Sequence, residues 1–554
     1  MRTGTWAKRM YFRRKTSDGR AYLQIVESRR HGDQVRQQVI ATLGRYEDLK
    51  ASGQLERLLR SGARFAEKAM VLGAIDDNTA AKISSRRIGP ALVFERLWDE
   101  SGCRAVVNEL SRDRKYDFEL ERAVFLTVLH RLIGGGSDRA ADRWREDYVI
   151  AGSEKLDLHH LYRAMAWLGE ELPSKEQDGR TPFVPRCVKD LVEERLFDHR
   201  RDLLTRLDLV FMDTTSLYFE GAGGRTLGRH GYSKDYRPDL RQIAVVIDGD
   251  GRPVCSEMWP GNTADVTTLI PVIERLRRRF AIARVCFVAD RGLMTAEAVA
   301  ELEARGLLYL LGVRERTDKL VRELVLEDPA PFVPLVISKR GKPIDYEAKV
   351  VTLAGRRYIV CRNHQEAQKD AADRVSILAS LERQLARGDK ALVSNTGFRR
   401  YLKTVSDEHF AIDPAKVEQE AKFDGIFVLR TNTALNPLEA MLCYKQLWTV
   451  EQTFRTAKHL FATRPIFHKV DETIRGHVFC SFLALVLKKT LEDRIAAQGR
   501  TGSWPEILAD LDSLTETEIE HDGKRFIVRS APRPAASLAL RATGVALPPT
   551  IRAG

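Results

Sequence analysis

The chain has 554 residues, 44% of them hydrophobic, which is enough for three or four domains that each bury a core. Its formal net charge of +13 favours a polyanionic partner. The seven cysteines show no Cys-x-x-Cys spacing, which argues against zinc and disulfide scaffolds, and the longest apolar stretch, residues 478–487, is too short to span a bilayer.

The first 200 residues predict two kinds of structure. The chain starts without the apolar core of a signal peptide, so we expect a cytoplasmic protein without membrane contact. The first 50 residues carry twelve Lys and Arg against five Asp and Glu, which suits DNA binding, although proteins without a DNA partner also show this bias. Within residues 9–45, apolar and polar residues alternate as in short β-strands. Residues 85–200 have apolar faces with a helical period. This helical region could bind DNA ends, dimerise or only pack.

Residues 201–313 predict three strands, a helix, a strand, a helix and a final strand. The first three strands form an antiparallel meander, because a Gly-Asp-Gly turn joins the second to the third. The predicted elements cover residues 207–219, 241–248, 253–259, 265–280, 284–290, 295–305 and 307–313. This is the ribonuclease H-like order, and we therefore expect an α/β fold with a ribonuclease H-like mixed-sheet core.

Two aspartates stand out within these strands. Asp213 interrupts the apolar run of the first strand, and Asp290 ends the fourth. An unpaired carboxylate in a buried strand is costly, and metal ligands are the usual exception. The alternative is that each Asp ends a strand or caps a helix. Two carboxylates and a third on a later helix could meet at one end of such a sheet and hold two Mg²⁺ ions.

A third candidate carboxylate, Glu451, lies in a predicted helix over residues 444–458. Positions seven apart in a helix differ by about 20° around its axis, so Tyr444, Glu451 and Lys458 share one face. Leu447 and Arg455 lie one turn either side of Glu451. A carboxylate flanked by cations suits a site that holds a phosphodiester. The alternative is an ordinary amphipathic helix with solvated charges.

Residues 314–436 separate the last predicted strand from this helix. Loops longer than about 12–15 residues are uncommon unless they form structure of their own, so this segment is expected to be a β-rich insertion subdomain. It shows a hairpin over residues 346–361, a helix over 366–387 and a strand over 425–430. After residue 498, a hairpin is expected around His521 and Lys524, followed by a Pro/Ala-rich tail that is expected to be partly disordered.

With these residues in place, the chain resembles the DDE transposases of bacterial insertion sequences. It is most similar to the group with a Tyr-x2-Arg-x3-Glu-x6-Lys signature, which Tyr444, Glu451 and Lys458 match. Leu447 departs from the signature Arg, and Arg455 could replace the missing phosphate contact. The segments 231–242, 261–268 and 289–294 also look like blocks of this family, and the resemblance covers about residues 205–485.

The resemblance implies a function and a set of site residues. Asp213, Asp290 and Glu451 would be the catalytic residues and would hold two Mg²⁺ ions, for which Mn²⁺ could substitute. The protein would bind the ends of its element and target DNA as double-stranded DNA, and cut and transfer strands by a cut-and-paste route through a hairpin. A homodimer in the synaptic complex is expected. The implied DNA contacts are Tyr444, Trp448, Arg455, Lys458, Lys234 and Arg237.

Several alternatives remain open at this point. Trp448 could unstack a base during hairpin formation or simply pack in the core. The inserted β-rich segment could contact the transposon end, as in the family, or only buttress the fold. A ribonuclease H-like structure-specific nuclease and an inactive, transposase-derived DNA-binding protein are the other candidate functions. The expected regions are a basic β-containing region (1–84), a mainly helical domain (85–200), the first segment of the ribonuclease H-like core (201–313), the insertion (314–436), the second segment of that core (437–497) and a C-terminal region (498–554).

Overall fold

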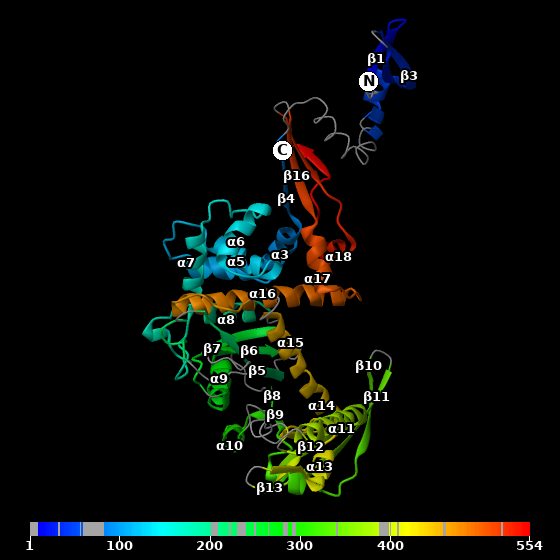
Figure 1. Cartoon of the computed structure of the whole chain (residues 1–554). Coiled ribbons are helices and arrows are strands. Elements are labelled where there is room, and N and C mark those ends of the chain that lie inside the picture. Colours follow the sequence, from blue (N-terminus) through cyan, green and yellow to red (C-terminus); the bar gives the residue numbers. More distant parts are fainter. Residues whose placement is uncertain are drawn as a thin grey trace. The chain divides into compact units, whose positions relative to one another are not determined.

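The computed structural model divides the chain into two compact units. One comprises Met1–Ser85, Glu516–Ala531 and Pro548–Gly554, and the other comprises Arg86–Thr515 and Pro532–Leu547. The described residues are 9–31, 34–55, 57–58, 82–200, 209–220, 223–229, 240–248, 251–263, 265–280, 286–290, 295–339, 342–386, 398, 400–406, 409–457, 461, 463–521 and 524–553. Figure 1 colours both units along the chain.

The first unit contains two antiparallel sheets. The first sheet is the meander β1 (Arg9–Ser17), β2 (Arg20–His31) and β3 (Gln34–Arg45), followed by the short helix α1 (Tyr46–Ala51). The second sheet has the order β18-β17-β16-β4, from β18 (Ile551–Ala553), β17 (Lys524–Arg529), β16 (Thr515–His521) and β4 (Lys82–Arg87). The strands expected within residues 9–45 and the hairpin that pairs His521 with Lys524 are confirmed.

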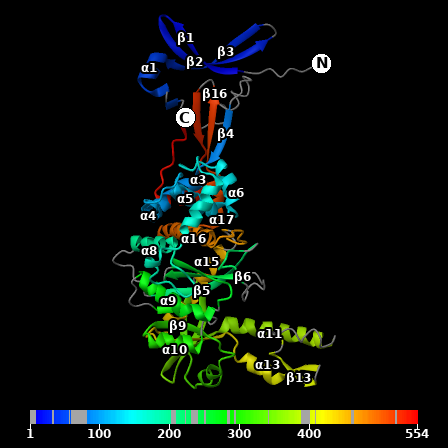
Figure 2. The same cartoon turned by 90° about the vertical axis from the view of Figure 1, so that its left-hand side faces the viewer.

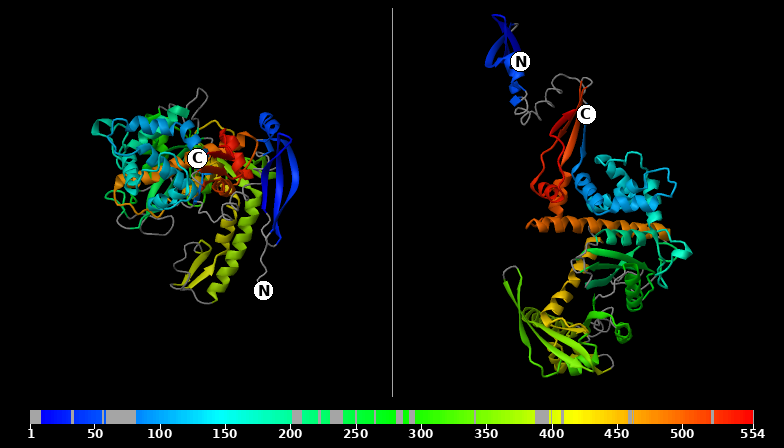
Figure 3. Two further views of the ribbon diagram at one scale, coloured as in Figure 1. Left: turned by 90° about the horizontal axis from the view of Figure 1, so that it is seen from above. Right: turned by 180° about the vertical axis from the view of Figure 1, so that it is seen from behind.

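In the second unit, helices from both ends of the sequence share one core. The N-terminal helices are α3 (Gly89–Glu100), α4 (Cys103–Ser111), α5 (Leu120–Ile133), α6 (Asp138–Trp144), α7 (Leu158–Leu168) and α8 (Val188–Arg200). The C-terminal helices α16 (Asp471–Ala497), α17 (Trp504–Asp512) and α18 (Pro534–Thr543) complete this core. Helix α16 lies between the helical layer and the sheet (Figure 1, Figure 3), which explains why its middle is apolar on all sides. None of the described helices is both long and apolar enough to cross a membrane.

The expectation of a partly disordered C-terminal tail is wrong. Helix α18 begins with Pro534 at its first turn and buries Leu538 and Leu540 in the shared helical core. Strand β18 then pairs with β17. The Pro and Ala content of this segment suggested low complexity, but Pro suits the first turn of a helix, and Ala lets a helix pack closely.

A nine-stranded mixed sheet forms the centre of the second unit, with the order β10-β11-β12-β15-β9-β8-β5-β6-β7. The meander is β5 (Leu209–Tyr218), β6 (Leu240–Asp248) and β7 (Pro253–Trp259), and β5 runs parallel to β8 (Cys286–Ala289) and β8 to β9 (Leu308–Val313). Helices α9 (Asp265–Phe280) and α10 (Ala296–Ala304) pack on one face, where their apolar residues meet alternate residues of β5, β8 and β9. The mixed α/β class is confirmed.

Residues 314–436 extend this central sheet. Strand β15 (Ile426–Thr431) pairs with β9 and leads on to β12 (Arg356–Asn363), β11 (Lys342–Leu353) and β10 (Val333–Lys339). Helix α11 (His364–Leu385) lies beside the small hairpin β13 (Leu402–Ser406) and β14 (His409–Ile412) and near α13 (Pro414–Ala421), as Figure 2 shows. The segment is β-rich, and its first and last strands belong to the same sheet as β5 and β8.

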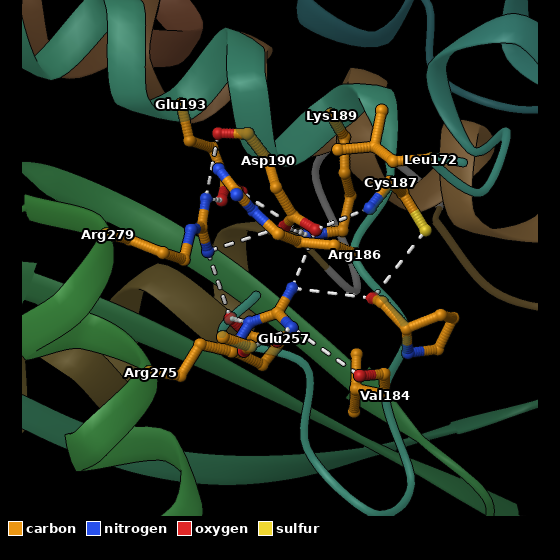
Figure 4. A network of polar contacts seen from close by, with 12 residues as sticks. Leu172, Val184, Arg186, Cys187, Lys189, Asp190, Glu193, Glu257, Arg275 and Arg279 are labelled. Atoms are coloured by element: carbon orange, nitrogen blue, oxygen red, sulfur yellow. Dashed lines mark hydrogen bonds and ion pairs between the residues drawn. The ribbon is translucent and has the colours of Figure 1, made fainter. Parts of the chain in front are cut away.

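A buried network of opposite charges fixes α8 and α9 to strand β7 (Figure 4). Its members are Lys189, Asp190 and Glu193 of α8, Glu257 of β7, and Arg275 and Arg279 of α9. Arg279 lies 2.6 Å from Glu193, and Arg275 lies 2.6 Å from Asp190. Three cations balance three carboxylates. Burial alone would raise the pKa of Asp190, but the neighbouring cations hold it well below its usual range.

Candidate active site

Two neighbouring parallel strands place the predicted aspartates side by side. Strands β5 and β8 are parallel, and Met212 pairs with Ala289, so Asp213 and Asp290 occupy the next position on each strand. Neighbouring strands lie about 4.8 Å apart. By the two-residue period of a strand, positions 213 and 290 belong to the face of Phe211 and Val288.

Two consecutive helices cover this face of the sheet. Helix α14 (Pro437–Lys445) begins with a capping box between Asn436 and Glu439, and α15 (Leu447–Arg455) packs against β5. The expectation of one continuous helix over residues 444–458 is therefore wrong in detail, because the helix is interrupted at Gln446. The Gln446 N–H donates to both Leu442 and Cys443 carbonyls, and the Thr449 N–H donates to the Gln446 carbonyl, which tightens the junction into a turn.

A pocket of about 260 Å³ lies between these helices and the strand ends. Asp290 from the end of β8 and Glu451 from α15 both line it, and both side chains are exposed to solvent. The other lining residues are Phe427, Tyr444, Lys445, Leu447 and Trp448. Within the described residues of the chain, the Glu451 carboxylate has no hydrogen-bond or ion-pair partner. The pocket thus contains two carboxylates that can take up ligands.

Tyr444 connects α14 to the first of these carboxylates. Its hydroxyl donates a hydrogen bond of 2.9 Å to Asp290 Oδ1. The tyrosine reaches this position across Gly312 of β9, where a Cβ atom would lie only 2.1 Å from the Tyr444 hydroxyl oxygen. Any side chain at position 312 would displace Tyr444, so the glycine makes room for the hydrogen bond.

The structure shows how far three other residues of α15 are buried. Trp448 is 57% exposed and lines the pocket, so simple core packing of this side chain is excluded. Leu447 is only 8% exposed and packs with Val450 and Met441, which explains how an apolar residue is tolerated at the signature Arg position. Arg455 lies at the end of α15 with its side chain exposed.

The remaining predicted contacts cannot be placed. Lys458, Lys234 and Arg237 lie outside the described residues, and for Asp213 only the strand position is described. The pocket also contains residues that the sequence did not suggest. Phe427 of β15 stacks near Tyr444, with ring centroids 6.2 Å apart, and the Lys445 ammonium lies 3.7 Å from the centre of the Tyr346 ring.

The chemistry of the pocket fits a hard divalent cation. Asp290 and Glu451 supply oxygen donors, and the described residues that line the pocket include no Cys or His, which a site for a softer metal would require. Outside the pocket, the side chains of Asp138, His468 and His477 lie close enough together to hold a metal ion. There, however, the Arg131 guanidinium lies 2.8 Å from His477 Nδ1 and 3.3 Å from Asp138, so a cation already satisfies those atoms.

Two protein-family models match this chain. A family model described as the transposase DDE domain matches residues 205–487, just over half of the 554 residues. A second model, the N-terminal domain of the IS1634 family of transposases, matches residues 8–76. None of the curated proteins matches. A solved piggyBac transposase synaptic complex with hairpin DNA is similar over 76% of this chain and 79% of that chain, with 12% identity and a TM-score of 0.37.

The DDE match spans the strand of Asp213, Asp290 at the end of β8 and the helix of Glu451; Asp290 and Glu451 line the pocket, and Asp213 occupies the strand position beside Asp290. The chain belongs to the DDE transposases of insertion sequences.

Proposed function

We propose that this transposase cuts and transfers DNA strands at the pocket that Asp290 and Glu451 line, with Asp213 as the third carboxylate. The observation that carries the proposal is the meeting of these elements. Asp290 and Glu451 share one pocket, and Asp213 occupies the strand position beside Asp290. The three carboxylates would hold two Mg²⁺ ions, or Mn²⁺ in their place. Bound divalent cations lower the pKa of a coordinated water and neutralise charge that develops on phosphodiester oxygens.

The protein side chains around the carboxylates would orient the substrate. Tyr444 holds the Asp290 carboxylate through its hydroxyl and thereby fixes one ligand before DNA arrives. Arg455 and Lys458 would contact phosphates beside the scissile bond, since a guanidinium and an ammonium both bind phosphate oxygens well. Lys234 and Arg237 would add contacts further along the strand.

The reaction we propose has two steps. Attack of water on one strand would break the bond at the end of the element and leave a 3′-hydroxyl group. That hydroxyl would then attack the opposite strand to form a hairpin, or attack the target DNA. The exposed ring of Trp448 at the pocket edge could fill the space left by an extruded base during hairpin formation, which lowers the cost of unstacking.

We further propose the arrangement of regions that this reaction needs. Residues 201–313 and 437–497 would form the ribonuclease H-like core, and the strands of residues 314–436 would contact the DNA end. The helical domain (85–200) could add DNA contacts. Two copies of the chain would hold two DNA ends in one synaptic complex in the cytoplasm.

Amide substitutions test the proposal, because an amide keeps the shape of a carboxylate but binds a cation weakly. Asp213→Asn, Asp290→Asn and Glu451→Gln are each expected to abolish Mg²⁺-dependent cleavage of a labelled duplex while DNA binding is largely retained. Glu297→Gln is the matched control, since Glu297 is an exposed carboxylate on α10, which packs on the opposite face of the sheet. Cleavage at the wild-type rate by any one of the three variants would remove that residue from the catalytic set.

A further inference from the structure

One face of the sheet formed by β1, β2 and β3 carries polar side chains across all three strands. In antiparallel strands, directly paired residues share a face. The paired rows on this face are Tyr11–Val26–Val39, Arg13–Gln24–Thr42 and Lys15–Tyr22–Arg45, with Ser28 and Gln37 belonging to a further row. Lys15, Gln37, Thr42 and Arg45 are exposed, and none of the described residues on this face is acidic.

Val26 on the polar face is buried, and the opposite face, where Met10 and Phe12 are exposed, packs against structure at one end. Helix α1 lies against it, where the Arg14 guanidinium lies 4.9 Å from the centre of the Tyr46 ring and forms an ion pair with Glu47. Leu49 of α1 is buried there beside Gly44. The acidic residues of α1 are therefore on the side of the sheet away from the polar face.

Hydrogen bonds hold the central side chains of the polar face in place. Arg13 donates to Gln37 Oε1 over 2.7 Å and to Gln24 Oε1 over 2.8 Å. Gln24 Nε2 in turn donates to the Thr42 hydroxyl, and Gln37 Nε2 to the Tyr11 hydroxyl. Counting bonds to described residues, each amide keeps one further N–H and one further acceptor position for a ligand. Less rotamer entropy is lost on binding when side chains are ordered beforehand.

Charge points to the chemical class of the ligand. The first 50 residues contain twelve Lys and Arg against five Asp and Glu, so this small region supplies more than half of the net charge of +13. Three strands are about 10 Å wide between the outer backbones, and the DNA major groove is about 12 Å wide. Arg pairs with guanine and Gln with adenine through two hydrogen bonds each.

We propose that this face of β1, β2 and β3 binds duplex DNA in the major groove and selects its sequence. Arg13, Gln24 and Gln37 contact base edges, while Lys15 and Arg45 contact phosphates. The inference rests on the proposed function in that it takes DNA as the substrate, but it assigns end recognition to a β-sheet distant in sequence from the catalytic residues. It also assigns a role to the region that matches the N-terminal domain model.

Adjacent glutamines on β3 provide the test. Gln37 pairs with Ser28 on the polar face, and Gln38 pairs with Glu27 on the other face, and both are exposed. The affinity of the full-length protein is measured by fluorescence anisotropy with duplexes taken from the DNA that flanks the reading frame, and with shuffled duplexes of the same composition. Gln37→Ala is expected to weaken binding of the flanking duplex about 5- to 100-fold, with little change for the shuffled one. Gln38→Ala should bind both as the wild type does.

Further variants separate the possible outcomes. Lys15→Ala is expected to weaken both duplexes alike and to reduce the salt dependence of binding by about one phosphate contact. Gln24→Ala repeats the test on a second strand, and thermal unfolding of each variant confirms that the sheet is intact. The proposal is overturned if Gln37→Ala and Gln38→Ala bind the flanking duplex with equal affinity. It is also overturned if Gln37→Ala binds both duplexes as the wild type does but no longer self-associates.

The catalytic proposal is tested independently of this face. If Asp290→Asn abolishes cleavage while Gln37→Ala leaves selective binding unchanged, this inference fails and the proposed function stands. If Gln37→Ala loses selective binding while the carboxylate variants still cleave, the proposed function fails and the DNA-binding face stands.

Discussion

Replacing Arg279 by methionine tests the role of the buried charge network in holding α8 and α9 on the sheet. The Arg279 guanidinium contacts Glu193 at 2.6 Å, Glu194 at 2.8 Å and Glu257 at 3.1 Å. Methionine fills a similar volume but carries no charge, so three fully buried carboxylates would face only two cations. Removing one partner from a buried charge network costs about 3–5 kcal/mol, because an uncompensated charge stays buried.

The expected shift in melting temperature follows from the size of the unit. The unit that contains the network has roughly 450 residues, and unfolding entropy is about 2.1 cal/mol/K per residue, or about 0.9 kcal/mol/K in total. A loss of about 3–5 kcal/mol therefore lowers the melting temperature by about 3–5 °C. Arg278→Met is the control, since the side chain of this neighbour is 63% exposed and its ion pair with Asp178 stabilises little.

The pH dependence provides a second readout for Arg279→Met. Burial already raises the pKa of Glu193, and loss of its Arg279 partner should raise it further. A folded-state pKa above the unfolded value means that the folded protein binds more protons, so acid stabilises the variant relative to the wild type. The difference in melting temperature should thus shrink between about pH 8 and about pH 5. A shift below about 1 °C at about pH 8, or one that is the same at both pH values, would refute the reasoning.

Two further predictions concern the pocket. Gly312→Ala should slow cleavage about 10- to 100-fold, because the new methyl group would push the Tyr444 hydroxyl off Asp290, and Tyr444→Phe should have a similar effect. The double variant should lose no more than either single one, and additive losses would mean that Gly312 acts through something else. If the Arg455 guanidinium replaces the signature Arg, Arg455→Ala should slow cleavage by about 10-fold or more. Adding Leu447→Arg to that variant should restore some of the rate. A loss of only a few-fold for Arg455→Ala would contradict the idea that Arg455 takes over this contact.

Local patterns predicted the individual elements well. The apolar period of α9 and the turn between β6 and β7 are visible in short windows of sequence. Helix α9 has the expected bounds, and β6 ends and β7 begins at the expected residues. Asp290 and Glu451 were singled out from an apolar run and from the signature spacing, and they line one pocket, while their catalytic role stays a prediction. The positions of the elements were predictable because each depends on neighbours along the chain.

Features that depend on distant partners were not predictable in the same way. The pairing of β15 with β9 joins residues more than 100 positions apart, which no short window encodes, and the break at Gln446 has no Pro or Gly to signal it. Gly312 is the informative exception. An isolated glycine inside an apolar strand is a signal of close approach by another group, but only the structure identifies that group as Tyr444.

The pairing of β15 with β9 has a consequence for how this protein can change over evolutionary time. The chain leaves strand β9 at Val313 and reaches its neighbour β15 at Ile426, so the two ends of residues 314–425 lie about 4.8 Å apart, although this excursion itself adds β10, β11 and β12 to the same sheet. A long excursion between such ends costs little more loop-closure entropy than a short one, because that cost grows only with the logarithm of length. Insertions and deletions in the connections between the strands of this excursion can therefore accumulate without moving Tyr444 or Glu451, whereas β11 and β12 themselves pack with α14 and α15. The distance from β15 to α15 along the chain is under much stricter control, since that short segment sets the register of the pocket.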